Sequence, residues 1–503
     1  MSEEKADAAA WLAVAAGTIG AFMATLDTSI VNSALPTIQG GIGAGADEGS
    51  WVSTAYLVAE IVMIPLAAWF EKIFGLRTFL LLATTLFVGF SVMCGTATGL
   101  NQMIIGRVGQ GFSGGAMIPT ALSIVATRLP PGQQAVGTAL FGMTAVLGPV
   151  FGPPIGGWLT VNVSWHYTFF LNIPVGILLV GLVMVGLPHR ETRPSLLLEA
   201  DWLGILGLAL GLGCLTVVLE DGQRERWFES ELIVRLSVVS AVGFLMLLVG
   251  QFVSRSPVID LGILLRPAFG GVFVCSLVVG AGVYGILYLI PQFLSSVPDY
   301  NAEQSGFVAM ISGIPPLLLM PLFPLLVRRF DLRVMIAIGL VAYTVGCYVN
   351  ASISPLANGQ QFVLSQVLCG VGQAFGLLFL NQAATATVPR DKAEDASGLF
   401  NAARNLGGSF GIAMIKTMLE RQQNLHGSRL QESVTANSVL AQEQVSPTMT
   451  PEAAQAALEG LKTTIDTQAT VMSYGDLYLI LAVLMAAALP AVLLIRPRRQ
   501  AEP

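Results

Sequence analysis

The sequence predicts an all-α protein that crosses a membrane many times, and two observations carry this prediction. Of the 503 residues, 54% are hydrophobic and only 11% are charged, whereas a soluble domain has roughly 25% charged residues. The apolar residues also gather in runs of about 20, the length that crosses a bilayer core as a helix. Lipid offers no partner for open backbone groups, and the runs do not alternate as barrel strands do, so each is predicted as a helix.

Fourteen such runs follow one another along the chain. The segments 188–201 and 253–268 are predicted as linkers, and 418–471 as a long polar loop holding short amphipathic helices. The N-terminus has no basic region before its first apolar run, so this run is expected to remain as a span. The predicted spans lie near 10–34, 50–70, 77–98, 103–126, 136–159, 167–187, 202–219, 232–252, 270–293, 306–327, 333–353, 362–385, 396–417 and 472–495.

Lysine and arginine set the predicted orientation. With the N-terminus in the cytoplasm, sixteen of the 25 basic residues fall inside, five fall outside, and four lie in spans or at their ends. Such an excess is typical of cytoplasmic loops. Both termini are therefore expected in the cytoplasm. The five outside residues are Arg224, Arg226, Arg421, Arg429 and Lys462.

An internal repeat divides the chain. Val108-Gly109-Gln110 with Phe112 recurs as Val371-Gly372-Gln373 with Phe375, and two further motifs recur in the same order. The predicted spans 7 and 8 have no counterpart and look inserted between two six-helix halves. The predicted domains are 1–187, a linker 188–268 with two extra helices, and 269–503 including the loop 418–471. Parallel repeats of this kind are a known plan of secondary transporters.

Four ionisable residues lie within predicted spans: Asp27, Glu60, Arg107 and Arg404. A charge at mid-bilayer costs about 2.5–3.5 kcal/mol on insertion scales and usually marks function. Asp27 and Glu60 are candidate proton carriers, with structural ion pairing as the alternative. Arg107 is expected to balance one of these acids, and Arg404 either pairs with an acid, binds an anionic substrate or holds backbone carbonyls.

Glycine and proline crowd the predicted fifth span. Small residues let helices approach closely, and proline removes a backbone donor and bends a helix. The alternatives are tight packing alone or a bent helix that controls leak between the two membrane faces. Pro65 is expected to break span 2, and span 10 is expected to be broken by Pro315, Pro316, Pro321 and Pro324. The fifth-span motif comprises Gly148, Pro149, Gly152, Pro153, Gly156 and Gly157.

Polar and aromatic residues at helical spacing are candidates for a substrate cavity. Tyr284, Tyr288 and Gln292 share a face of span 9 by their i, i+4 spacing. Asn381 and Gln382 lie in span 12, and Arg404 is the sixth candidate. Core packing is the alternative for the tyrosines.

The sequence argues against an enzyme, a metal site, a cofactor and a nucleic-acid partner. It has only three His and no HExxH or nucleophile motif. The five Cys lie inside apolar runs without metal-ligand spacing, which is typical of buried structural residues. No lysine falls in a phosphate-binding loop, so ATP-driven pumping by this chain is not expected.

At several motifs the sequence resembles the major facilitator superfamily, specifically the fourteen-spanner EmrB/QacA-type drug:proton antiporters. The segments are LDTSIVNSALPTI in span 1, GRVGQGFSGG in span 4, LGPVFGPPIGGW in span 5, WHYTFFLNIPVG opening span 6 and FNAARNLGGSFGIA in span 13. The resemblance implies that Asp27 couples transport to protons. It also implies that Arg107 is the arginine of the family's span-4 motif and that span 5 carries the family's antiporter motif. In the loop between spans 2 and 3, Ala68 stands at the usual glycine and the usual Asp is absent.

The resemblance implies a proton-coupled multidrug efflux antiporter of the bacterial cytoplasmic membrane that exports amphipathic molecules by alternating access. Gram-negative relatives work with a periplasmic adaptor and an outer-membrane channel, and the loop 418–471 would suit such docking. The alternative function is a dedicated exporter or facilitator of one metabolite, in which the acids are structural.

Overall fold

The computed structural model describes residues 6–189, 192, 195, 201–254, 257–389, 392–433 and 451–495. These residues form helices and short 3-10 turns and contain no strand. The predicted basic residues Arg190, Arg193, Arg255 and Arg390 and the middle of the loop 418–471 lie outside them.

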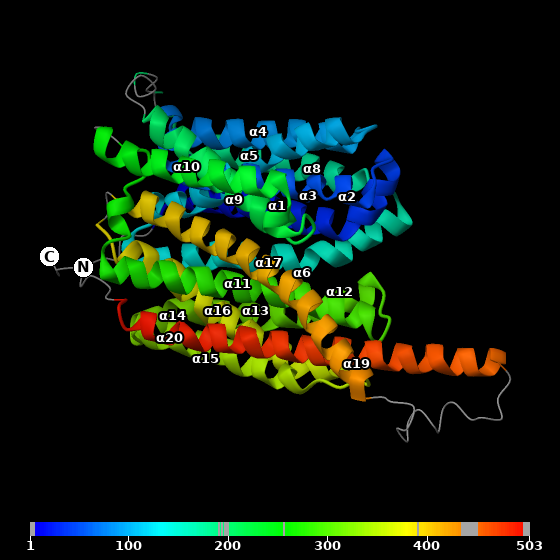
Figure 1. The fold of residues 1–503 in the computed structure, drawn as a ribbon. Coiled ribbons are helices and arrows are strands. Elements are labelled where there is room, and N and C mark those ends of the chain that lie inside the picture. The colour runs from blue at the N-terminus through cyan, green and yellow to red at the C-terminus, as the bar shows by residue number, and fades with distance from the viewer. Residues whose placement is uncertain are drawn as a thin grey trace.

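The helices form one elongated bundle (Figure 1). The first helix begins and the last helix ends at the same end of the bundle, which we call the near end. The opposite end of the bundle is called the far end. In chain order the helices are α1 (Ala8–Ile42), α2 (Ala46–Gly49), α3 (Trp51–Phe74), α4 (Leu76–Gly95), α5 (Leu100–Arg128), α6 (Pro131–Asn162), α7 (Tyr167–Phe170), α8 (Asn172–Gly186), α9 (Trp202–Asp221), α10 (Glu231–Val253), α11 (Pro267–Ser296), α12 (Ala302–Met310), α13 (Ile314–Leu319), α14 (Phe323–Arg329), α15 (Leu332–Val349), α16 (Val363–Ala386), α17 (Ala393–Ser433), α19 (Pro451–Ala487) and α20 (Leu489–Val492).

Twelve helical segments among the described residues are long and apolar enough to cross a membrane, and each overlaps one of the predicted spans. The predicted spans 4 and 13 correspond to α5 and α17, which are helices of full length but carry more polar and charged residues. The chain therefore has the multi-pass architecture that its composition predicts.

Proline affects the two predicted break points differently. Helix α3 continues through Pro65 without interruption, so the predicted break of span 2 is wrong. Span 10 is divided into α12, α13 and α14 by 3-10 turns at Ile311–Gly313 and Met320–Leu322. Each of the three later segments of span 10 has a proline in its first two positions, where a helix does not need that backbone donor.

The polar segment 418–471 also differs from the prediction. Helix α17 continues to Ser433, and α19 begins at Pro451 and runs on into the last span. Long continuations of the spanning helices therefore replace the expected short amphipathic helices. Helix α19 extends beyond the far end of the bundle (Figure 1). A 2.7 Å hydrogen bond between His426 Nε2 on α17 and Asp476 Oδ2 on α19 holds the two helices together.

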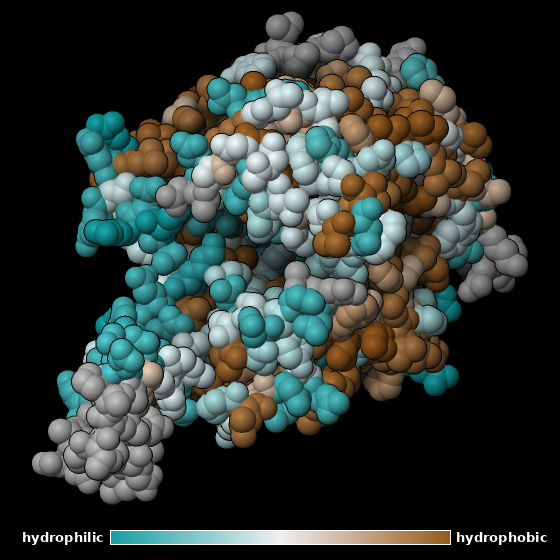
Figure 2. Space-filling view, turned by 90° about the vertical axis from the view of Figure 1, so that its right-hand side faces the viewer, coloured by the Kyte–Doolittle hydropathy of each residue, from teal (hydrophilic) through white to brown (hydrophobic). Residues whose placement is uncertain are grey.

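Helices α1 to α8 pack with one another, as do α11 to α20, and we call these groups the first and second halves. Helices α9 and α10 form a close hairpin, because a Cβ on Gly243 would lie only 2.4 Å from the Gly211 nitrogen. Helix α9 contacts α3 of the first half and α17 of the second. At the far end, hydrophilic residues surround a recess on the left of the molecule, and hydrophobic residues dominate its right flank (Figure 2).

Candidate functional site

A buried ion pair lies inside the first half. Arg107 of α5 donates through Nη1 to Oδ2 of Asp27 on α1 at 2.6 Å, and both side chains are fully buried. The expected pairing of Arg107 with an acid is thus found with Asp27. A buried pair is stable only when its remaining polar atoms are also satisfied, because both charges have lost their water.

Amides and a hydroxyl supply most of the remaining hydrogen bonds. Asp27 Oδ1 accepts from Asn172 Nδ2 at 2.7 Å and from Gln110 Nε2 at 3.1 Å. Gln110 Nε2 also donates to Ser91 Oγ at 2.8 Å, and its Oε1 accepts from Arg107 at 3.0 Å. Three donors from α5 and α8 therefore hold the Asp27 carboxylate.

The Arg107 guanidinium is fixed on its other sides by α3. Its Nε donates to the Val52 carbonyl at 2.9 Å, and its Cζ lies 4.3 Å from the centre of the Tyr56 ring. A cation over an aromatic face is stabilised by the ring quadrupole. Arg107 Nη2 is buried without a hydrogen-bond partner, so the network leaves one donor unused.

Glu60 stands apart from this network. Its side chain is buried on α3, yet within the described chain no hydrogen bond or ion pair engages its carboxylate. Close packing fixes its position, because a Cβ on Gly115 of α5 would lie 2.6 Å from the Glu60 carbonyl oxygen. Its electrostatic neighbours are Arg404, Arg107 and Asp27.

Arg404 approaches Glu60 from the second half. It lies on α17 with 7% of its surface exposed, and its Nε is buried without a partner. Its Nη2 donates to Asn405 Oδ1 at 3.4 Å, a long contact. A carboxylate and a guanidinium with unused hydrogen-bonding capacity thus face one another across the two halves.

The predicted cavity residues divide into two groups. Tyr284 lies close to Glu60 and Arg404 and packs against Gly408, and Tyr288 lies near Lys416, whose Nζ is 5.8 Å from the ring centre. Gln292 is exposed at the end of α11. The predicted shared face therefore brings the two tyrosines to α17 but leaves Gln292 at the surface.

Asn381 and Gln382 lie on α16 away from this meeting point. Asn381 is buried, and its Oδ1 has no hydrogen-bond partner. Gln382 is half-buried. In the described part of the chain nothing connects them to Glu60 or Arg404 by a hydrogen bond.

The fifth-span glycines form a packing face against α1. A Cβ on Gly148, Gly152 or Gly156 would lie 2.5, 2.2 or 2.3 Å from the hydroxyl oxygen of Thr25, Ser29 or Ser33, respectively. The three glycines and the three hydroxyl residues each repeat every fourth position, so α1 and α6 interlock along two turns. Gly157 has open space around it and does not belong to this face.

The prolines of the same motif point elsewhere. Gly306 of α12 lies beside Pro153 and Pro154, since a Cβ there would be 3.6 and 3.9 Å from them. Pro149 instead accepts a 3.4 Å hydrogen bond from Ser29 through its carbonyl. Helix α6 remains one continuous helix, with its glycines toward α1 and two of its prolines toward the second half.

Charged residues also join the halves at the near end. Lys392, before α17, forms an ion pair with Asp260 of the segment after α10. Asp395, one residue before predicted span 13, accepts a hydrogen bond from the Asp260 backbone and interacts with Lys72 of α3. Burial raises the pKa of Asp395 above its ordinary value of 3.8, although both lysines oppose the shift.

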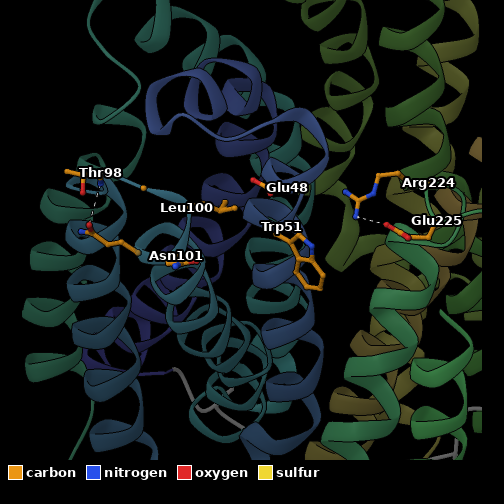
Figure 3. Close-up of a pocket in the computed structure, with 9 residues that line it drawn as sticks. Glu48, Trp51, Thr98, Leu100, Asn101, Arg224 and Glu225 are labelled. Carbon is orange, nitrogen blue, oxygen red and sulfur yellow. Dashed lines mark hydrogen bonds and ion pairs between the residues drawn. The ribbon is translucent and has the colours of Figure 1, made fainter. Parts of the chain in front are cut away.

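A solvent-open cavity of about 760 Å³ lies at the far end. Figure 3 shows Arg224 and Glu225, which follow α9, across this cavity from Glu48 of α2 and Trp51 at the start of α3. Arg224 bridges to Glu225 at 3.5 Å and to Asp221 at 3.4 Å, and it also donates to Ser50. The hairpin of α9 and α10 thus closes one side of the cavity.

Sequence reasoning missed three members of the Asp27 network: Ser91, Gln110 and Asn172. Gln110 could have been predicted from the sequence as a partner of Arg107. It follows Arg107 by one helical turn, and a buried polar side chain needs a hydrogen-bond partner. Ser91 and Asn172 lie on α4 and α8, and their approach to Asp27 depends on tertiary packing.

Comparison with known proteins identifies the family. Residues 17–412 match the Major Facilitator Superfamily. The chain is 32% identical over 482 residues to the colistin resistance protein EmrB of Acinetobacter baumannii, covering 95% of this chain and 94% of that protein. It is 31% identical over 418 residues to the multidrug export protein EmrB of Escherichia coli K12 (83% and 81% covered), and 30% identical over 496 residues to the fatty acid resistance protein FarB of Neisseria gonorrhoeae (98% and 97%).

Solved structures share the fold at low sequence identity. The human organic anion transporter MFSD10 aligns with a TM-score of 0.57 at 14% identity, covering 95% of this chain and 99% of that chain. The proton:xylose symporter XylE aligns with a TM-score of 0.58 at 15% identity, covering 95% of each. The chain therefore belongs to the major facilitator superfamily, and within it to the EmrB-type multi-pass inner-membrane transporters rather than to any class of enzyme.

Proposed function

We propose that this protein is a proton-coupled antiporter that exports amphipathic small molecules from the cytoplasm by alternating access. Its EmrB relatives are named for multidrug export and colistin resistance, which supports an efflux role. The names of its relatives also include fatty acid resistance, so kinship supports a broad amphipathic class rather than one compound.

The observation that carries the proposal is the contrast between the two buried acids. Three donors hold the Asp27 carboxylate, whereas Glu60 has no hydrogen-bond partner among the residues that the structure describes and faces Arg404 of the other half. A proton competes with fewer partners at Glu60. Neutralising Glu60 removes its attraction to Arg404, which changes the relative energy of states in which the halves are close or apart.

Asp27 and Arg107 have a different part in this mechanism. When Asp27 takes a proton, Arg107 loses its counter-ion inside the first half and must find other acceptors. Such a change strains the packing of α1, α3, α5 and α8 together, so Asp27 acts within one half and Glu60 between halves. The substrate lies between the halves, near Tyr284, Tyr288 and Arg404. Gln292, Asn381 and Gln382 contribute less because they lie outside this meeting point.

We further propose fourteen spans with both termini in the cytoplasm and the near end facing inward. Adding α5 and α17 to the twelve apolar segments gives an even count, which suits chain ends that share one side. The domains 1–187, 188–268 and 269–503 follow from this arrangement. The extended ends of α17 and α19 would then project into the periplasm, where they would suit a periplasmic adaptor that leads to an outer-membrane channel.

A second candidate function is a dedicated exporter or facilitator of one metabolite, in which the acids are structural. The complete burial of the Asp27–Arg107 pair favours this view for Asp27 alone. Glu60 fits it less well, because a buried carboxylate that no hydrogen bond engages within the described residues is costly to keep for structure alone.

Reconstituted proteoliposomes separate the two candidates. The full chain is reconstituted into vesicles that contain a pH-sensitive dye. Proton movement is recorded when a lipophilic cation such as ethidium is added. Glu60→Gln and Asp27→Asn should each lower substrate-driven proton movement at least tenfold, whereas the exposed control Glu229→Gln should not. Wild-type proton movement in both variants would exclude coupling through these acids.

A further inference from the structure

Helix α17 carries a second meeting of charges, which involves the inserted helix α9. Glu220, in the last turn of α9, accepts a hydrogen bond from Ser409 and lies beside Lys416, both on α17. The side chains of Glu220 and Lys416 are half-buried, whereas Ser409 is buried. The inserted hairpin therefore supplies an acid to the same helix whose Arg404 faces Glu60.

The two charge sites are connected along α17. Ser409 follows Arg404 by five residues, a rise of about 8 Å in an α-helix. Tyr284 spans part of this interval, because it packs on Gly408 and lies close to both Glu60 and Arg404. Polar groups thus run from Glu60 toward the far end of the bundle.

The site also borders the solvent-open cavity. Asp221, the next residue after Glu220, bridges to Arg224 at 3.4 Å, and Arg224 lines the cavity of about 760 Å³ (Figure 3). Asp221 Oδ2 is buried without a hydrogen-bond partner. Water that fills the cavity therefore lies about one helical turn from Glu220.

Lys416 has an alternative contact, which allows the site two arrangements. Its Nζ lies 5.8 Å from the centre of the Tyr288 ring, within the range of cation–π attraction. When Glu220 is charged, its carboxylate attracts the Lys416 ammonium group. When Glu220 is neutral, the tyrosine ring remains as a partner for the ammonium group.

We propose that Glu220 is a relay carboxylate that passes protons between the far-end cavity and Glu60. A hydronium ion in the cavity gives its proton to the Glu220 carboxylate, leaving water and a neutral acid. The proton then moves through intervening water to the Glu60 carboxylate, and Glu220 regains its charge and its attraction for Lys416. The groups that face Glu220 during this exchange are Ser409 and Lys416 of α17 and Asp221 of its own helix.

This inference rests on the proposed proton coupling and gives the inserted hairpin a direct part in it. A purely structural contact is the competing explanation, because other hairpin residues also bind α17. Trp227 Nε1 donates to Thr417 Oγ1 at 3.1 Å, and Gln223 Nε2 donates to Glu420 Oε2 at 3.0 Å. A test must therefore distinguish proton delivery from attachment.

The test uses the full chain in proteoliposomes with ethidium as the probe. Glu220→Gln keeps the hydrogen-bonding shape but cannot carry a proton. It should slow substrate-driven proton movement at least tenfold, while ethidium binding and ethidium exchange without a pH gradient stay within twofold of wild type. Glu220→Asp should restore a substantial part of the proton movement with a displaced pH profile, and Glu229→Gln should match wild type.

Two results would overturn the relay. One is unchanged proton movement in Glu220→Gln; the other is an equal loss of binding, exchange and proton movement in Glu220→Gln and in Trp227→Phe, which removes only the attachment to Thr417. Failure of the proposed function looks different, because the wild-type protein itself would then move no protons when ethidium is added.

Discussion

Substitution at Gly152 tests whether the glycine face of α6 is a packing requirement. A Cβ added there would lie 2.2 Å from Ser29 Oγ, 2.3 Å from Ser29 Cβ and 2.9 Å from the Ser29 backbone carbon. Ordinary contact begins near 3.4 Å. Because Ser29 Cβ moves only with its backbone, the two helices must separate by about 1 Å to remove the overlap. Overpacking of this kind costs about 1–3 kcal/mol.

Gly157 provides a matched control on the same helix. Nothing lies within 4 Å of an added Cβ there, and replacing a helical glycine by alanine stabilises the helix by about 0.5–1 kcal/mol. Gly152 lies in the same helix and gains the same term, so Gly152→Ala should be less stable than Gly157→Ala by about 1–3 kcal/mol, the overpacking cost alone. Thermal unfolding of the purified protein in detergent measures the order and size of the difference.

A compensating change sharpens the test. Ser29→Gly in the Gly152→Ala background removes both side-chain atoms that the new methyl group meets, and leaves only the backbone contact at 2.9 Å. The double variant should recover more than half of the lost stability. If Gly152→Ala unfolds at the same temperature as Gly157→Ala, close approach of α1 and α6 is not what these glycines provide.

Two further predictions concern buried charge. Asp27→Asn should destabilise the protein by about 3–5 kcal/mol, because it leaves the fully buried Arg107 without a counter-ion. Adding Arg107→Met should restore stability in the same unfolding assay. A double variant no more stable than Asp27→Asn would contradict this. Asp395→Asn should remove part of the pH dependence of the protein's stability. Because the folded state raises the pKa of Asp395, it favours the neutral carboxyl group. The resulting contribution to stability is complete below pH 3.8 and is lost as the pH rises through the raised pKa. The variant should therefore gain on wild type as pH increases from about 4 to 7, and parallel unfolding curves across that range would refute the assignment.

Much of the architecture could be predicted because lipid permits few backbone solutions. Long apolar runs must be helices, and twelve of the fourteen predicted spans coincide with apolar helical segments. The extent of α17 and α19 was harder to predict, because their polar continuations lack the apolar periodicity that marks a helix. The unbroken passage of α3 through Pro65 depends on neighbouring helices, and composition does not record those neighbours.

The candidate site shows a similar division. A charge within a span is conspicuous, so Asp27, Glu60, Arg107 and Arg404 could be singled out from the sequence. Their partners could not be assigned, since Asn172 reaches Asp27 only through the packing of α8 on α1. Glu220 escaped notice because it lies at a helix end, where an acid is unremarkable until its neighbours on α17 are known.

Helix α6 contacts α1 of the first half with one face and α12 of the second half with another. Its glycines bind it so closely to α1 that neither helix can slide without the other, whereas Pro153 and Pro154 meet Gly306 of α12 at ordinary contact distance. The two prolines offer no backbone N–H to α12 at this point. At the near end α6 is held by a hydrogen bond, because Arg328 Nη2 of α14 donates to the Gly132 carbonyl at 2.9 Å. Movement of the second half along α6 must therefore break this bond at the near end, whereas at Pro153 and Pro154 it only shifts packed side chains.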